Sequence, residues 1–156
     1  LVGSAASPLS ELAFALDQAI NNTSLVLMLT YFGSTLLLPG DAQYGNWRFW
    51  LEDAGSDALL KTVVFYKVSH HGSINATPKQ VVDALPKGKF AAMVSTQSEP
   101  WPSIPRMPLL KKLTAASRGL VRSDCISVSG APAAVKMSRP PSGFTRGAFW
   151  VDYEVP

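Results

Sequence analysis

Three side chains with metal-binding chemistry stand directly after predicted strands. Asp41 ends the segment TLLLPGD, and His70 and His71, the only histidines of the chain, follow the segment VVFYKVS. Carboxylates and neutral imidazoles are ligands that divalent cations such as zinc accept in proteins. Each side chain also has a simpler interpretation: Asp41 could cap the following helix, and the histidines could be loop residues bonded to backbone groups. The residues alone leave both interpretations open.

The residues after the histidines predict a turn and then a helix. Gly72 permits a sharp turn or a close approach of the backbone. Ser73 could hydrogen-bond a ligand or cap the next helix. Thr77 is the expected cap of that helix, with Pro78 at its first position.

The hydrophobic pattern places these residues in a fold of alternating strands and helices. Two apolar runs joined by Gly33-Ser34 predict a β-hairpin, and their nearly continuous apolar character is typical of strands buried on both faces. We therefore expect an α/β fold with a mixed sheet, and chemistry at the carboxyl ends of its strands. The predicted strands cover 24–32, 35–40, 63–69, 90–96, 120–124, 125–129, 133–137 and 149–155. The predicted helices cover 8–20, 44–54, 78–85 and 108–117, and 139–147 is expected to be a loop.

The composition limits the class of protein. The chain has 156 residues, 47% hydrophobic and 16% charged, and we expect residues 1–156 to form a single domain with a core. These shares exclude a disordered tail and a highly charged coiled coil. The net charge of +3 is unclustered and does not indicate a nucleic-acid-binding stripe. The single cysteine excludes an intrachain disulfide, and no apolar run reaches the roughly 18 residues of a membrane span.

Two motifs taken together resemble a known family. The segments NNTSLVLMLTYFGSTLLLPGDA and KVSHHGSINATP are similar to the second half of the metallo-β-lactamase fold superfamily, in particular to the hydrolase domain of the DNA-uptake competence proteins. The resemblance extends from Asn21 to about Ser127. It implies half of an αββα sandwich, in which a mixed β-sheet is flanked by helices.

The resemblance also implies roles for the three candidate residues. Asp41 matches the carboxylate that bridges two metal ions, and one of His70 and His71 matches the last histidine ligand, with His71 preferred. The metal set would then be Asp41, His70 and His71, and the catalytic pair Asp41 and His71. The ions would be zinc, with manganese as the alternative, and a hydroxide on them would attack a phosphodiester, ester or amide.

The chain departs from the family in one main respect. The His-x-His-x-Asp-His motif of the first half is absent, and the chain begins at Leu1. We therefore expect a missing N-terminal half or a partner chain to supply the remaining ligands. Two functions follow: part of a metal-dependent hydrolase acting on a phosphodiester or ester, or a non-catalytic interaction or structural module that has lost its N-terminal metal-binding half. The cytoplasm is the compartment we favour.

Overall fold

The structure is a computed structural model that describes residues 23–97, 102–125, 140–147 and 150–156. The helix expected over 8–20 lies outside these residues, and the strands expected over 125–129 and 133–137 fall in or run into the undescribed range 126–139. None of the described helices is long and apolar enough to cross a membrane.

The described elements alternate as the sequence predicts. In chain order they are β1 (Leu27–Tyr31), β2 (Ser34–Leu38), α2 (Tyr44–Leu51), α3 (Ser56–Leu60), β3 (Val63–Lys67), the 3-10 helix η1 (Ser69–Gly72), α4 (Lys79–Ala84), β4 (Ala91–Val94), α5 (Met107–Ala116), β5 (Gly119–Arg122), the 3-10 helix η2 (Ser123–Cys125), β6 (Phe144–Arg146) and β7 (Val151–Tyr153). The α/β class is therefore confirmed.

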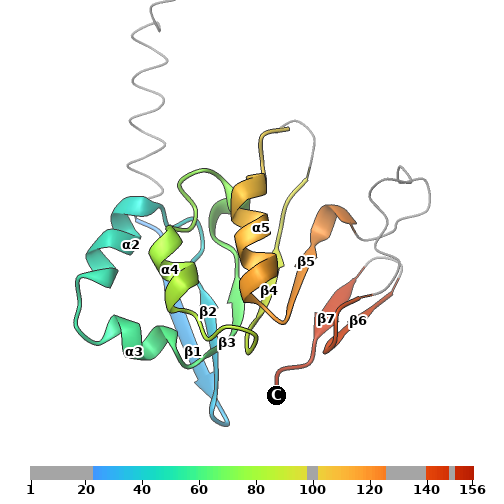
Figure 1. Cartoon of the computed structure of the whole chain (residues 1–156), viewed down its shortest axis with the longest axis horizontal. Helices are drawn as coiled ribbons and strands as arrows, with labels where there is room; N and C mark the ends of the chain where they lie inside the picture. The colour runs from blue at the N-terminus through green and yellow to red at the C-terminus, as the bar shows by residue number, and fades with distance from the viewer. Residues whose placement is uncertain (1–22, 98–101, 126–139, 148–149) are drawn as a thin grey trace, which may run out of the picture.

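A mixed sheet forms the centre of the molecule (Figure 1). Its five strands lie in the order β1-β2-β3-β4-β5. The predicted hairpin is present, because β1 and β2 pair antiparallel with Leu29 opposite Leu36. The pairs β2–β3, β3–β4 and β4–β5 are all parallel. The carboxyl ends of four neighbouring strands consequently meet at one edge of the sheet.

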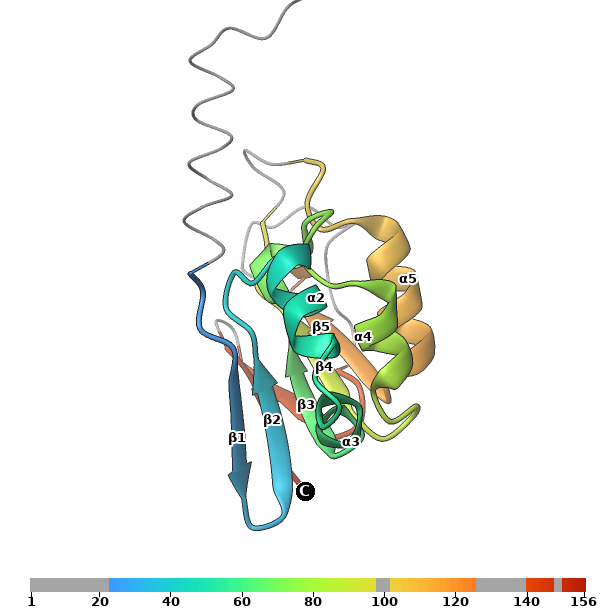
Figure 2. The same ribbon diagram turned by 90° about the vertical axis from the view of Figure 1, so that its left-hand side faces the viewer.

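Helices cover one face of this sheet (Figure 2). Their apolar side chains pack on Leu37, Tyr66 and other buried sheet residues to form the main core. Trp47 of α2 is completely buried there, and its indole Nε1 donates a hydrogen bond to the Ala76 carbonyl at 2.8 Å. This core fixes the strands from the helical side.

A second, two-stranded sheet packs on the opposite face. Its strands β6 and β7 pair antiparallel, and Phe144 is buried against Ala91 and Val121. The Tyr153 ring stacks on Phe65 with 5.5 Å between the ring centres. The expectation of a loop over 139–147 was therefore wrong for β6. The strand β6 has three residues, which is too short to show a hydrophobic period. The Gly and Pro residues on either side of it favour a loop.

The burial predicted for the first hairpin strand was also wrong. β2 is largely buried, but in β1 Leu29 is 48% and Tyr31 is 73% exposed. Among the described strands, β1 lies at the edge of the sheet and pairs only with β2. An apolar run predicts a strand but does not reveal its place in the sheet, so the exposure of β1 at the edge could not be predicted from the sequence.

The helix α4 starts one residue later than predicted. Pro78, not Thr77, is the N-cap, and the helix begins at Lys79. The Thr77 hydroxyl instead lies 2.7 Å from the phenol oxygen of Tyr66, which is completely buried. A tertiary partner for Thr77 thus replaces the local cap that its position suggests.

The burial of Tyr66 predicts a loss of stability in alkali. Desolvation raises the pKa of Tyr66, although its hydrogen bond with Thr77 acts in the opposite direction. Below about pH 10 the phenol is neutral in both folded and unfolded chains, so the pKa shift has no effect on stability there. Above that pH the unfolded chain loses the proton first, and stability should fall by up to about 1.4 kcal/mol per pH unit.

Urea unfolding at pH 9 to 11.5 measures this effect. Tyr66→Phe should flatten the alkaline decline, whereas Tyr31→Phe, which removes an exposed phenol, should leave it unchanged. Equal slopes for wild type and Tyr66→Phe would contradict the assignment.

Candidate metal and substrate site

Polar residues follow each of the four neighbouring parallel strands. Asp41 comes after β2, His70 and His71 after β3, Thr96 after β4, and Ser123 after β5. In open α/β sheets this edge is where ligands bind, because loops of different strands converge on it. The edge is therefore the first place to look for chemistry.

The turn that carries Asp41 lies against the turn that carries the histidines. The His70 N–H donates to the Gly40 carbonyl at 3.0 Å. The Ser69 hydroxyl lies 3.3 Å from the same carbonyl and also donates to the Ala42 carbonyl. The backbone of the Asp41 turn is thus held beside the histidine turn, as the sequence predicts, but among the described residues Asp41, His70 and His71 do not form a metal-binding group, and Asp41 does not line the pocket beside the histidines. The structure does not place the carboxylate and the histidines at opposite ends of the sheet.

The interpretation of Asp41 as a helix cap was wrong. The N-cap of α2 is Gln43, and the first turn of that helix contains no acidic residue. The backbone N–H of Gln43 donates a hydrogen bond to the side-chain oxygen of Asn46 at 3.1 Å. Asp41 lies two residues before the cap and is exposed.

A lysine reaches the same end of the sheet. Lys67, the last residue of β3, is half-buried, and burial lowers its pKa while the charge of Asp41 acts to raise it. The Asp41 carboxylate therefore has a cationic neighbour in this structure. It is not an isolated charge.

The two histidines adopt an unusual backbone conformation. His70 has φ 41° and His71 has φ 54°, and Gly72 follows with φ 75°. Left-handed conformations are unfavourable by about 1–2 kcal/mol for each residue with a Cβ atom. Such conformations persist only where surrounding contacts impose them, and they cluster at functional sites.

One local and one tertiary hydrogen bond hold this strained turn in place. The Ser73 N–H donates to the His70 carbonyl at 2.9 Å, and the Arg106 N–H donates to the Gly72 carbonyl at 2.8 Å. A Cβ atom added at Gly72 would lie 2.9 Å from the Cβ atom of Pro105. Gly72 thus serves a close backbone approach, one of the roles its sequence position suggests.

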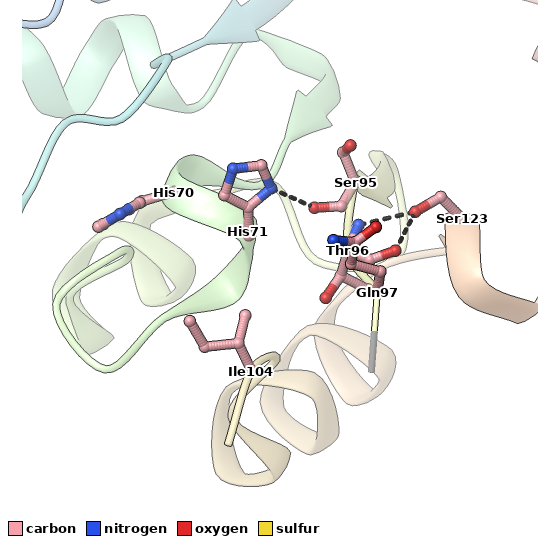
Figure 3. A pocket seen from close by; sticks show the side chains of 7 residues that line it. All are labelled: His70, His71, Ser95, Thr96, Gln97, Ile104 and Ser123. Atoms are coloured by element: carbon pink, nitrogen blue, oxygen red, sulfur yellow. Dashed lines mark hydrogen bonds between the residues drawn. The ribbon is translucent and has the colours of Figure 1, made fainter. Parts of the chain in front are cut away.

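The ring of His71 is oriented by a backbone carbonyl (Figure 3). Its Nδ1 lies 2.8 Å from the carbonyl oxygen of Ser95. A carbonyl can only accept, so Nδ1 carries the proton, and in the neutral ring Nε2 then presents a lone pair. Metal-ligating histidines commonly have this arrangement, with a carbonyl on the second nitrogen. The exposed ring of His71 therefore has the chemistry of a ligand.

His70 differs in its partner and in its exposure. It is half-buried, and its Nδ1 lies 3.1 Å from the Ser73 hydroxyl. Ser73 therefore contacts the candidate site and does not cap α4. The hydroxyl can donate or accept, so the tautomer of His70 is not fixed by this bond. His71 is the better-oriented ligand of the pair.

A pocket of about 670 Å³ opens beside the histidines. Its walls are formed by His70, His71, Ser95, Thr96, Gln97, Ile104 and Ser123. Sequence reasoning did not single out the last five as site residues. The signal that could have found Thr96 and Ser123 is their place at the ends of predicted strands.

The donor set suits a divalent cation but is incomplete. Carboxylate oxygen and imidazole nitrogen are appropriate ligands, and the carbonyl on His71 supports a ligand role. Within the described ranges, however, no three His, Cys, Asp or Glu side chains lie together as a metal group. A catalytic zinc generally needs three protein ligands. The described residues thus fit part of a metal centre.

We expect the 156-residue chain by itself to hold zinc weakly. After dialysis, metal analysis should find well below one ion per chain, because too few ligands converge. Two tightly held ions per chain, with no other chain present, would contradict this expectation.

Comparisons with known proteins return no relative. The chain matches no family model, no curated protein and no solved structure. The fold shown is therefore the α/β class with a mixed sheet and flanking helices.

Proposed function

We propose that this chain is part of a metal-dependent hydrolase of the metallo-β-lactamase type that cleaves a phosphodiester or ester. The observation that carries the proposal is the strained His70–His71 turn, held against the Asp41 turn at the carboxyl edge of four strands. A conformation this unfavourable is retained more readily at a working site than in an ordinary surface loop.

The chain's own residues would contribute in distinct ways. Asp41 would supply a carboxylate able to bridge two cations, and His71 would supply Nε2 while the Ser95 carbonyl keeps its ring in position. His70 would add a second imidazole on the Asp41 side of the turn. Bound zinc, or manganese, would supply Lewis acidity and lower the pKa of a water molecule.

The remaining ligands would come from an N-terminal half or a partner chain. The exposure of the β1–β2 hairpin supports this arrangement. Leu27 and Leu29 lie on the face away from the helices, opposite Leu38 and Leu36 of β2. Leu27 is 40% exposed and Leu29 is 48% exposed. A second sheet packed there would complete an αββα sandwich and bury these side chains.

The alternative is a non-catalytic interaction or structural module. It is favoured by one specific observation, the lack of a three-residue metal group in the described part of the chain. The module would keep Asp41 and the histidines as remnants of a lost site.

Reconstitution separates the two functions. The coding sequence upstream of Leu1, or a co-purifying chain, is searched for a His-x-His-x-Asp-His motif, and that segment is expressed together with this one. Zinc- or manganese-dependent turnover of bis(4-nitrophenyl) phosphate supports the hydrolase. Absence of the motif, or no turnover above background with zinc or manganese present, supports the module.

A further inference from the structure

Two strand ends bring Ser123 to the peptide group that orients His71. β4 and β5 pair in parallel, so Ser123, the first residue after β5, lies beside the residues that follow β4. The Thr96 N–H donates to the Ser123 hydroxyl oxygen at 2.7 Å. This N–H and the Ser95 carbonyl belong to one peptide group, and that carbonyl accepts from His71 Nδ1 at 2.8 Å. Ser123 is therefore one peptide group away from the His71 ring (Figure 3).

The direction of each hydrogen bond in this series is fixed. The Ser123 hydroxyl donates its one hydrogen to the Thr96 carbonyl at 2.6 Å. Its oxygen then has only lone pairs left for the Thr96 N–H, and both bonds are partly buried. On the other side of the peptide group, the Ser95 carbonyl accepts from the ring N–H. Hydrogen bonds that run in one direction polarise and strengthen one another.

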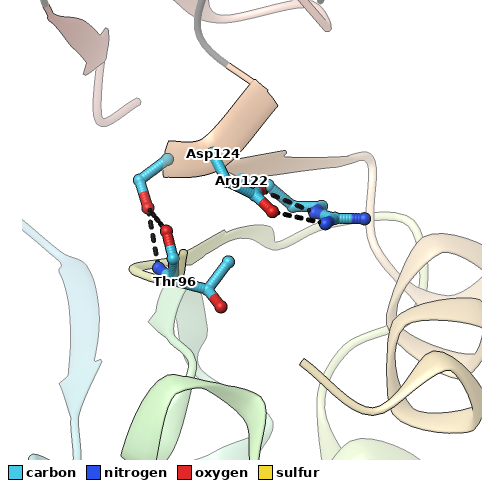
Figure 4. Close-up of polar contacts among 4 residues, drawn as sticks. Thr96, Arg122 and Asp124 are labelled. Atoms are coloured by element: carbon cyan, nitrogen blue, oxygen red, sulfur yellow. Dashed lines mark hydrogen bonds and ion pairs between the residues drawn. The ribbon is translucent and has the colours of Figure 1, made fainter. Parts of the chain in front are cut away.

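Ser123 is itself held by its two neighbours. Arg122 and Asp124 bind each other through two bonds of 2.9 and 2.6 Å (Figure 4). The Arg122 side chain is 29% and the Asp124 side chain 10% exposed, so this ion pair is better shielded from water than the exposed pairs of α2 and α3. A pair with two parallel bonds has a defined geometry. The backbone that carries the Ser123 hydroxyl is therefore restrained on both sides.

The orientation of the peptide group between residues 95 and 96 decides which nitrogen of His71 is free. While its carbonyl points at Nδ1, the neutral ring keeps its proton there and has a lone pair on Nε2. If the peptide group rotated, the ring would lose this acceptor. The proton would then be free to move to Nε2 and remove the lone pair. A simpler role for Ser123 is to close the end of β5 against β4, in which case the ring would not respond to its loss.

We infer that Ser123 is a positioning residue for His71: through the peptide group of residues 95 and 96, its hydroxyl keeps the proton on Nδ1 and leaves Nε2 free for a metal ion. The part of this inference that concerns the ring stands on the hydrogen bonds alone, and the part that concerns the metal rests on the proposed function.

The tautomer of His71 in the 156-residue chain tests the inference without metal. Ser123→Ala removes the hydroxyl, and the chain should still fold because residue 123 is exposed. Proton–nitrogen correlation NMR at about pH 9, where histidines are ordinarily neutral, measures the ratio of the Nδ1–H to the Nε2–H form. Nδ1–H should be the main form in the wild type, and the ratio should fall about threefold or more in Ser123→Ala. Ser123→Thr, which keeps the hydroxyl, should restore the ratio.

Ser56→Ala is the matched control. The Ser56 hydroxyl also donates to a backbone carbonyl, that of Asp53 at 2.9 Å, but Ser56 does not line the pocket beside the histidines. Its replacement should leave the tautomer ratio of His71 unchanged. The inference is overturned if Ser123→Ala has the wild-type ratio, if both serine variants change it equally, or if the wild-type ring carries its proton on Nε2. A Ser123→Ala chain that does not fold overturns it as well, because the hydroxyl then serves folding.

Zinc binding by the reconstituted protein separates this inference from the proposed function. Ser123→Ala should weaken zinc binding about tenfold, as loss of a residue that supports a ligand typically does. A tautomer that depends on Ser123, in a protein that binds no zinc and shows no turnover, retains the positioning of the ring and rejects the hydrolase. A changed tautomer with unchanged zinc affinity overturns the part that concerns the metal. An unchanged tautomer overturns the role of Ser123, whatever the hydrolysis assay shows.

Discussion

Replacing Asp41 by alanine in the reconstituted protein is expected to lower phosphodiester hydrolysis by about a thousandfold or more. If Asp41 has the proposed bridging role, its loss would leave two neighbouring cations without a shared anion, so at least one should be lost. The metal-free fold should be retained, because Asp41 is exposed and is not the cap of α2. Metal content, melting temperature and turnover are measured on the same preparations.

Asp152→Ala provides the control for loss of a carboxylate. Asp152 is an exposed residue of β7, on the two-stranded sheet. Its replacement should change neither metal content nor turnover. Unchanged metal and unchanged turnover in Asp41→Ala would exclude the bridging role and leave the non-catalytic module as the better account.

The second large effect concerns stability. Gly72→Ala should destabilise the fold by about 2–5 kcal/mol, the sum of a left-handed residue gaining a Cβ atom and of overpacking. The new Cβ atom would lie 2.9 Å from Pro105 and 3.5 Å from Val94, so the loop after β4 or the histidine turn must shift. Chemical denaturation measures the loss.

Gly88→Ala separates the two contributions. Gly88 has φ 69°, close to the 75° of Gly72, but a Cβ atom there would meet nothing within 4 Å. Only the conformational part, about 1–2 kcal/mol, should be lost. Equal losses for both variants would show that the contact with Pro105 has no energetic importance.

The part of the site carried by strand ends could be predicted from the sequence. Asp41 and the histidines follow apolar runs, and parallel strands bring such residues to one edge. The distinctive geometry could not be predicted. Histidine is several-fold enriched among non-glycine residues with left-handed conformations, but such residues are a few per cent of all, so the sequence does not mark His70 and His71 as strained. Their conformation comes from contacts with Gly40 and with residue 106 of a distant loop.

The pocket wall shows the same limit. Ser95 acts through its backbone carbonyl, which every residue possesses, so its side chain carries no signal of the bond to His71. The Thr96 hydroxyl has no hydrogen-bond partner among the residues that the structure describes, which is a property of the folded chain and not of the sequence. The same limit applies to the fold. The place of β1 in the sheet and the existence of the short strand β6 depend on tertiary pairing, which the sequence pattern does not show.

The most direct test of the proposed metal site at Asp41 and His71 is anomalous diffraction at the zinc absorption edge from crystals of the reconstituted protein. The proposal predicts zinc at this edge of the sheet, with an Asp41 carboxylate oxygen and His71 Nε2 each about 2.0–2.2 Å from an ion. The proposal would be contradicted if zinc bound without contacting both Asp41 and His71. It would also be contradicted if a zinc-saturated crystal gave no anomalous peak beside these two residues.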